Sequence, residues 1–167
     1  MQQSDSWQLT GKDYHIDDRV MFVEAMRSTT RERCVKLPQQ APLIEAARLL
    51  SRAQINLIVI VDESDRLAGV LSKTDVVRQM GTCAGNACAI PIESVMTREV
   101  STCRPDELLS EAWSRMRARG IKHMPVVNSQ GHPVGVLYAR DALALLLEAA
   151  TYEELLLRDY VLRVGYQ

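Results

Sequence analysis

The stretch Gly69-Val70-Leu71-Ser72-Lys73-Thr74-Asp75 has a second, altered copy in the chain, Gly135-Val136-Leu137-Tyr138-Ala139-Arg140-Asp141. The copies lie 66 positions apart, and the same shift places residues 39–75 over residues 105–141 without a gap. Identical pairs are several times more frequent in this alignment than average composition produces by chance. They are Leu43/Leu109, Glu45/Glu111, Ala46/Ala112, Ile55/Ile121, Val61/Val127, Gly69/Gly135, Val70/Val136, Leu71/Leu137 and Asp75/Asp141. Such a repeat indicates a duplicated unit whose two copies pack on each other.

Each copy opens with an amphipathic helix, because its apolar residues recur at i, i+3, i+4 and i+7. These residues are Leu43, Ala46, Ala47 and Leu50 in the first copy and Leu109, Ala112, Trp113 and Met116 in the second. Pro42 suits the first turn of one helix, and Asp106 is expected to cap the other or to lie in its first turn. We expect Trp113 and Met116 to pack in the core or at a dimer interface.

Two strands and a second helix follow in each copy. Short apolar runs predict buried strands, and the residues between them are turn formers. The predicted strands are residues 57–61 and 67–71 in the first copy and residues 124–127 and 134–138 in the second. Helices are predicted to begin near Thr74 and near Arg140, with a final helix over residues 153–164. The fold class is therefore α/β (α+β), with two β-α-β-β-α units related by a pseudo-two-fold axis.

These patterns divide the chain into five predicted segments. Residues 1–17 form a flexible N-terminal segment, residues 18–81 the first repeat, residues 82–91 a linker of small residues, residues 92–150 the second repeat and residues 151–167 a helical tail.

Composition argues against several classes of protein. Lys and Arg number 20 and Asp and Glu 21, which gives a net charge of −1 and argues against nucleic acid as a partner. No apolar run is long enough for membrane insertion, and the polar N-terminus lacks the apolar core of a secretory signal. Four cysteines are too few for a disulfide scaffold in a chain of 167 residues. We expect a cytoplasmic protein.

The tandem order and the Gly-x-x-Ser-x-x-Asp motif resemble the CBS domain pair, often called a Bateman module. His123-Met124-Pro125-Val126-Val127 and Ser94-Val95-Met96-Thr97 resemble other parts of that family. The resemblance covers about residues 20–150. It implies a stand-alone regulatory module that binds AMP, ADP, ATP, an NAD-type compound or S-adenosylmethionine between the repeats. It also implies a homodimer formed through the helices of the repeats.

The first motif suits a nucleotide on chemical grounds as well. Free backbone N–H groups at a helix start and the helix dipole favour a phosphate, to which Ser72 adds a hydroxyl and Lys73 a cation. The Asp75 carboxylate can accept hydrogen bonds from both ribose hydroxyls. The alternative is that Asp75 is a capping acid with a structural role only. The predicted nucleotide-binding residues are Ser72, Lys73, Thr74 and Asp75, with Val35, Ile55, Asn56 and Leu57 beside the adenine.

The second motif has Tyr138 where the first has Ser72. Either this site is degenerate, or Tyr138 stacks on a base while Arg140 contacts a phosphate. Asp141 keeps the place of the ribose acceptor. His123, beside Lys122 at a strand start, is either a rim residue or a phosphate ligand whose binding depends on pH. We predict one good site at the first motif and place Lys122, His123, Tyr138, Arg140 and Asp141 in a second, doubtful one.

Three rival functions remain open. A dimerising adaptor would keep empty clefts, and Tyr138 favours it. A regulator linked to nucleic acid would use a basic strip of Arg115, Arg117, Arg119 and Lys122, which otherwise is a solvated helix end. An enzyme is not expected, because no catalytic constellation is recognisable. Cys83 and Cys88 lack a second ligand pair, so no metal site is predicted. The leading hypothesis is a ligand sensor that signals to an unidentified protein target by changing the angle between repeats or the dimer packing.

Overall fold

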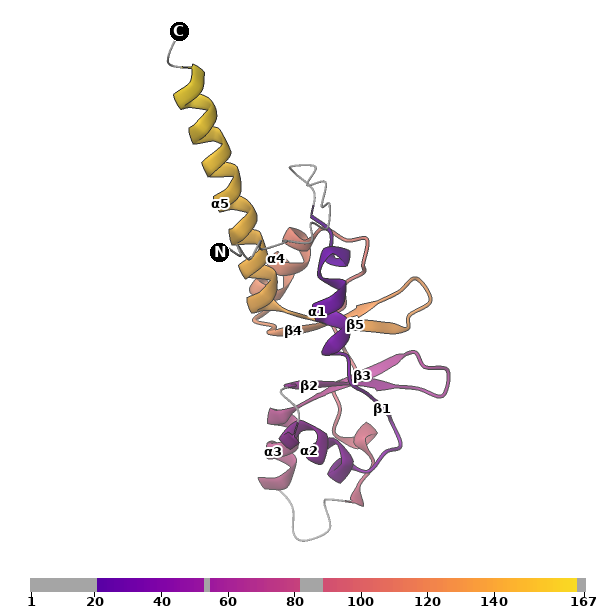
Figure 1. The fold of residues 1–167 in the computed structure, drawn as a ribbon. Coiled ribbons are helices and arrows are strands. Elements are labelled where there is room, and N and C mark those ends of the chain that lie inside the picture. Colours follow the sequence, from indigo (N-terminus) through magenta and orange to yellow (C-terminus); the bar gives the residue numbers. More distant parts are fainter. Residues whose placement is uncertain (1–20, 53–54, 82–88, 165–167) are drawn as a thin grey trace, which may run out of the picture.

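The computed structural model describes residues 21–52, 55–81 and 89–164. The predicted flexible segment 1–17, and Cys83 and Cys88 in the predicted linker, lie outside these residues. The helices are η1 (Val23–Met26), α1 (Arg27–Glu32), α2 (Leu43–Arg52), α3 (Lys73–Gly81), η3 (Ile92–Ser94), α4 (Leu109–Arg119) and α5 (Ala139–Val164). The strands are β1 (Lys36–Pro38), β2 (Leu57–Val61), β3 (Leu67–Ser72), β4 (His123–Val127) and β5 (Pro133–Tyr138). The predicted mixed α+β class is confirmed (Figure 1).

The first repeat has the predicted order β-α-β-β-α. Its sheet has the order β1-β2-β3, in which β1 runs parallel to β2 and β3 runs antiparallel to it. Every residue of β2 is buried, because this central strand is covered on one face by the helices and on the other by the second repeat. Such burial explains why its sequence is continuously apolar.

The second repeat departs from the predicted order, because its first strand is reduced to one parallel bridge between Cys103 and Val126. Pro125 gives the reason. In the first repeat the N–H of Val59 donates to the carbonyl of Val35 at 2.9 Å. Pro125 stands at the position equivalent to Val59 and has no N–H, so the ladder cannot extend from Cys103 back toward Ser101.

Two further predictions about helices are wrong. Asp106 does not cap α4, whose N-cap is Leu108, and instead forms an exposed ion pair with Arg104 at 2.9 Å. The helices predicted from Arg140 and over residues 153–164 are one continuous helix of 26 residues. The physical reason is that α5 contains neither Gly nor Pro and is rich in Ala, Leu and Glu, which all favour helix.

The two repeats exchange short segments. Val23 and Met26, which lie at the start of the first repeat, are buried in the core of the second with Leu109, Met116 and Met124. Trp113 is partly buried against the same core. Conversely, Ile92 and Met96 complete the core of the first repeat. The linear boundaries of the repeats therefore do not coincide with the boundaries of their cores.

The glycine of each motif lies where an exchanged segment crosses the sheet. A Cβ atom on Gly69 would stand 2.7 Å from the carbonyl oxygen of Thr97, and one on Gly135 would stand 2.8 Å from the Thr30 hydroxyl. Thr97 exchanges backbone hydrogen bonds with Val70 at 2.9 and 3.0 Å. Glycine is required at both places because the crossing segment, by its backbone at Thr97 and by its side chain at Thr30, approaches too closely for a Cβ atom.

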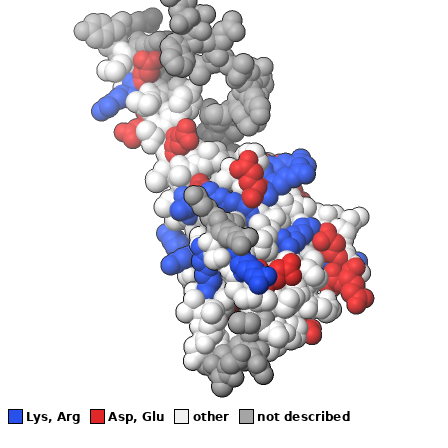
Figure 2. Space-filling view, turned by 60° about the horizontal axis from the view of Figure 1, so that its bottom comes forward, with Lys and Arg blue, Asp and Glu red and all other residues white. Residues whose placement is uncertain are grey.

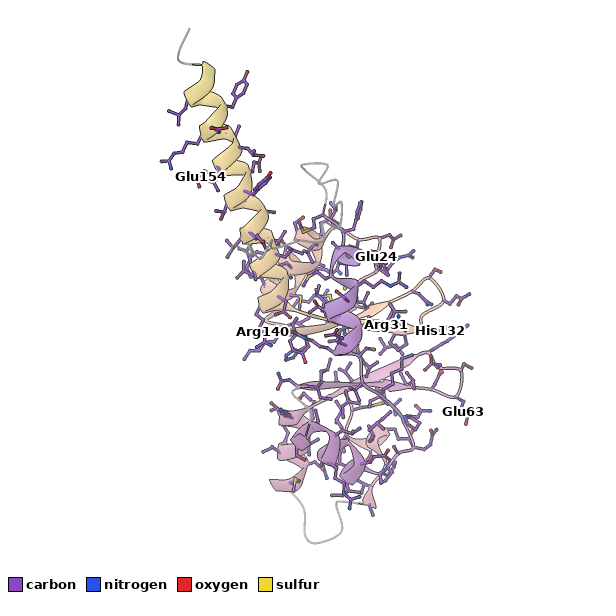
Figure 3. The ribbon with its side chains drawn as sticks, in the orientation of Figure 1. Glu24, Arg31, Glu63, His132, Arg140 and Glu154 are labelled. Atoms are coloured by element: carbon purple, nitrogen blue, oxygen red, sulfur yellow. The ribbon has the colours of Figure 1, made fainter. Side chains whose placement is uncertain are left out.

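The sheets of the two repeats pack face to face. Leu57, Val59 and Val61 of β2 form one buried layer with Val136 and Tyr138 of β5. The β2–β3 and β4–β5 hairpins point in the same direction, with Glu63 and His132 near their tips (Figures 1 and 3). The helices α3 and α5 consequently begin at the opposite end, where Figure 3 labels Arg140.

Helix α5 leaves the body of the molecule and extends away from it (Figure 1). The residues beyond Ala150 whose side chains are described are all exposed, including Tyr152, Leu156 and Tyr160. Among the described helices, even this one is not apolar enough over a sufficient length to cross a membrane.

Candidate functional site

The two motifs meet through Asn56, the residue before β2. The Asn56 N–H donates to the Tyr138 hydroxyl at 3.3 Å, and its carbonyl accepts from the N–H of Lys73 at 3.4 Å. In the second repeat the carbonyl of Lys122 accepts equivalently from the N–H of Ala139 at 3.0 Å. The starts of α3 and α5 therefore face one region between the repeats, as the duplication requires.

Ser72 and Asp75 form a reciprocal capping box at the start of α3. The Asp75 carboxylate accepts from the Ser72 N–H at 2.9 Å and from its hydroxyl at 2.6 Å, while the Asp75 N–H donates to the Ser72 hydroxyl oxygen at 3.2 Å. This arrangement satisfies helix-terminal donors that would otherwise lack a partner. The other carboxylate oxygen lies 3.5 Å from Arg78, whose side chain is exposed. The structural role weighed for Asp75 is thus present in the fold.

The remaining residues predicted for the first site differ in accessibility. Lys73 and Thr74 are exposed, and Asn56 and Val35 are partly buried. Ile55 belongs to the core of the first repeat and Leu57 to the layer between the sheets, each with 6% of its surface exposed. An adenine near them would contact the rim of the core rather than an open slot.

Arg33 contacts two residues of the second motif, although it was not among the predicted site residues. Its guanidinium forms an ion pair with Asp141 and lies over the Tyr138 ring, 4.2 Å from the ring centroid. Arg140 also approaches Tyr138, at 5.6 Å, and Asp141, at 3.4 Å. Tyr138 itself is 3% exposed. Ion pairs and cation–π contacts thereby join Arg33 and Arg140 to Tyr138 and Asp141 in the second motif.

His123 completes this cluster. Its ring meets the Tyr138 ring edge-on, with 4.4 Å between the centroids. Burial lowers the pKa of His123, and the positive charges of Lys122, Arg140 and Arg33 lower it further. The neutral imidazole is therefore the form that the fold favours.

We expect the stability of the protein to fall as the pH is lowered from about 7.5 to 5. The unfolded chain takes up a proton near the ordinary pKa of histidine, about 6.5, whereas folded His123 takes it up only at lower pH. The contribution of His123 to stability is therefore fully present above that value and decreases as the pH falls below it. His123→Phe, which keeps a ring against Tyr138, should show a flatter dependence in urea unfolding across this range. Equal pH dependence of the two proteins would contradict this assignment.

The basic strip considered from the sequence is largely engaged within the protein. Arg115 forms an ion pair with Glu107 and donates to the Thr102 carbonyl at 2.9 Å. Arg119 donates to the Ser101 hydroxyl at 2.6 Å, and Arg117 lies over the Trp113 ring. In Figure 2, Lys and Arg side chains gather around the middle of the face shown, with Asp and Glu among them. The mixture does not favour a phosphate backbone as the partner.

The described cysteines have the character of core residues. Burial raises the pKa of the Cys103 thiol to about 12, and it also raises the pKa of Cys34. A reactive cysteine needs a lowered pKa, so neither thiol has the environment of a nucleophile. Within residues 21–52, 55–81 and 89–164, no three His, Cys, Asp or Glu side chains are grouped to hold a metal ion.

Comparison with known proteins adds to this geometry. The sequence model of the CBS domain matches residues 24–81 and again residues 92–148. A 17.7 kDa protein of Acidianus ambivalens is 25% identical over 126 residues, which cover 75% of this chain and 74% of that protein. Several other relatives are chloride-channel, acetyltransferase or sulfurtransferase proteins, of whose length this chain spans between 13% and 24%.

Solved structures also resemble this chain. The CBS domain pair of protein MJ0100, in complex with 5′-methylthioadenosine and S-adenosylmethionine, is 25% identical, with a TM-score of 0.65. The match covers 75% of this chain and 99% of that one. The cytosolic domain of the Mg²⁺ channel MgtE, in complex with ATP, is 26% identical, with a TM-score of 0.58, over 68% of this chain and 45% of that one.

Proposed function

Because this chain belongs to the CBS domain family, we propose that it is a regulatory module that binds an adenosine derivative between its repeats, without catalysing a reaction. The observation that carries the proposal is the Ser72–Asp75 pair at the start of α3. It places a carboxylate, which can accept from ribose hydroxyls, and a hydroxyl at a helix start, where the helix dipole and the exposed Lys73 cation favour a phosphate. The ligands of the MJ0100 pair and of the MgtE domain support an adenosine group.

Binding of the ribose hydroxyls would replace the hydrogen bond that the Ser72 hydroxyl donates to Asp75. They would donate to Asp75, whose carboxylate now accepts from Ser72. The exposed side chains of Lys73 and Thr74 stand at the first two positions of α3, where a phosphate is favoured by charge and by the helix dipole. AMP, ADP or ATP are the first candidates, and NAD and S-adenosylmethionine share the same ribose.

Signalling would start from this exchange. A change in hydrogen bonding at Ser72 and Asp75 shifts the start of α3, which Asn56 connects to Tyr138 of the second repeat. The ligand then favours one relative arrangement of the repeats, by no more than its difference in affinity for the two arrangements. An unidentified protein target would recognise that arrangement.

Isothermal titration calorimetry with AMP, ATP, NAD and S-adenosylmethionine tests the binding function. At least one ligand should bind with a Kd below about 1 mM, the weakest affinity that the proposal accepts. Binding of none of the four would favour the alternative of a dimerising adaptor with empty clefts.

A homodimer formed through the helices is part of the same proposal. Helix α3 exposes Val77 and Met80, and α5 exposes apolar side chains along its length. An exposed apolar surface of this extent is typical of an interaction site. Light scattering after size exclusion should give twice the chain mass of 18.8 kDa, and the mass of one chain at micromolar concentration would contradict it.

A further inference from the structure

The two motifs keep the same acid but engage it differently. Asp75 contacts Ser72 and Arg78, which belong to the start and first turns of its own helix. Asp141 has no capping hydroxyl beside it, since Tyr138 stands in place of Ser72, and it pairs with Arg33 from 108 residues earlier in the chain. The second acid is therefore held by a part of the chain outside its own repeat.

Arg33 makes the two contacts that a bound nucleoside would make at the second motif. A ribose would donate hydrogen bonds to the Asp141 carboxylate, and a base would stack on the Tyr138 ring. The Arg33 guanidinium donates to that carboxylate and lies over that ring, with its central carbon 4.2 Å from the ring centroid. Guanidinium groups combine these two modes of contact better than any other side chain.

The burial of the three side chains shows that Arg33 covers the part of the second motif where a nucleoside would bind. The side chains of Arg33 and Asp141 are 24% and 23% exposed, and Tyr138 is 3% exposed. A base could not reach the Tyr138 ring while Arg33 covers it. Arg140, whose side chain is 73% exposed, remains at the surface beside the pair.

Within the described part of the chain, the ion pair and the capping contact of Asp75 come from Arg78 and Ser72 of its own repeat, and the repeat gives a reason for the difference. The shift of 66 positions holds before the first strand, because Leu37 pairs with Ile60 as Cys103 pairs with Val126. It places Glu99 at the position equivalent to Arg33. A glutamate in that place would repel Asp75 instead of pairing with it.

We infer that Arg33 is an internal occupant of the second motif, which limits the protein to one nucleotide per chain, at the first motif. This inference rests on the proposed function, because it assumes that the first motif binds a nucleotide. Arg33 is thus a specificity-determining residue that sets the stoichiometry. Its ion pair with Asp141 also connects the segment between α1 and β1 to the second repeat.

Calorimetric titration with AMP tests the inference by counting sites. The wild-type protein should bind one AMP per chain, and Arg33→Ala should bind two, because Asp141 and the face of Tyr138 become available. Arg31→Ala removes the same charge from an exposed position of α1 and should still bind one. Arg33→Gln, which loses the charge but keeps the aliphatic part of the side chain and a polar end, should also bind two and is measured in case the alanine variant folds poorly.

The outcomes separate this inference from the function on which it rests. Two AMP molecules on the wild-type chain would overturn the inference and leave the proposed function standing. One molecule on both Arg33 variants would overturn it as well, and so would a tenfold loss of affinity in them, since Arg33 would then be a ligand contact. No AMP on the wild type but one on Arg33→Ala would support the internal occupant and refute the first motif as the AMP site.

Discussion

Asp75→Ala should weaken the binding of AMP by about tenfold to a hundredfold, since a hydrogen bond to a charged group is worth about 1.5–3 kcal/mol. The carboxylate is the acceptor proposed for the ribose hydroxyls, and in the ligand-free fold it accepts from Ser72 at 2.6 Å. Calorimetry at constant pH and salt measures the change directly.

The same substitution also removes a helix cap, so stability must be measured beside affinity. Loss of a capping contact costs about 0.5–2 kcal/mol, which should appear as a lower urea midpoint. Glu45→Ala is the matched control, because it removes an exposed acid from the first turn of α2 in the same repeat and should leave affinity unchanged. Equal affinity of Asp75→Ala and the wild type would leave Asp75 with the structural role alone.

Ile92→Ala should destabilise the protein by about 2–5 kcal/mol, the usual cost of truncating a fully buried isoleucine. Ile92 is 0% exposed and packs in the core of the first repeat, although it lies in the segment that leads into the second. Removing its side chain leaves a cavity in the core cluster that also contains Leu43 and Ile58. Equilibrium unfolding in urea gives the free energy.

Val134→Ala serves as the comparison for this experiment. Val134 is a partly exposed residue of β5, so its truncation should change the free energy of unfolding by less than about 0.5 kcal/mol. If both variants unfolded at the same urea concentration, the exchange of segments between the repeats would not exist in solution.

Sequence periodicity predicted the parts of the fold that depend on local pattern. The stripe from Leu43 to Leu50 is the buried face of α2, and the apolar run over residues 57–61 is β2 with the same bounds. Membership of the CBS family, inferred from the two motifs, is confirmed by the match to both repeats. The strand predicted over residues 124–127 is β4, which begins one residue earlier, at His123.

The features that were missed depend on contacts between distant residues. The helices η1 and α1 had no counterpart in the prediction, because Val23 and Met26 find their partners in the second repeat. Pro125 alone, by its missing N–H, could have predicted the shortened first strand of that repeat. The alignment of the repeats began at residue 39, so the contrast between Arg33 and Glu99 fell outside it.

The predicted site residues show the same division. The N-terminal position of Ser72 and Asp75 on α3 follows from local sequence, and the capping box was the alternative weighed for it. The contact between Asn56 and Tyr138 joins two repeats, and no local pattern predicts it. The binding roles of these residues remain predictions that need a ligand.

A crystal structure of the protein grown with AMP tests the central claim most directly. We expect the ribose hydroxyls within hydrogen-bonding distance of the Asp75 carboxylate, with the phosphate beside the side chains of Lys73 and Thr74. Arg33 should stay on Asp141, as it does without ligand. AMP bound at Asp141 with Arg33 displaced, or at a place away from both motifs, would contradict the account.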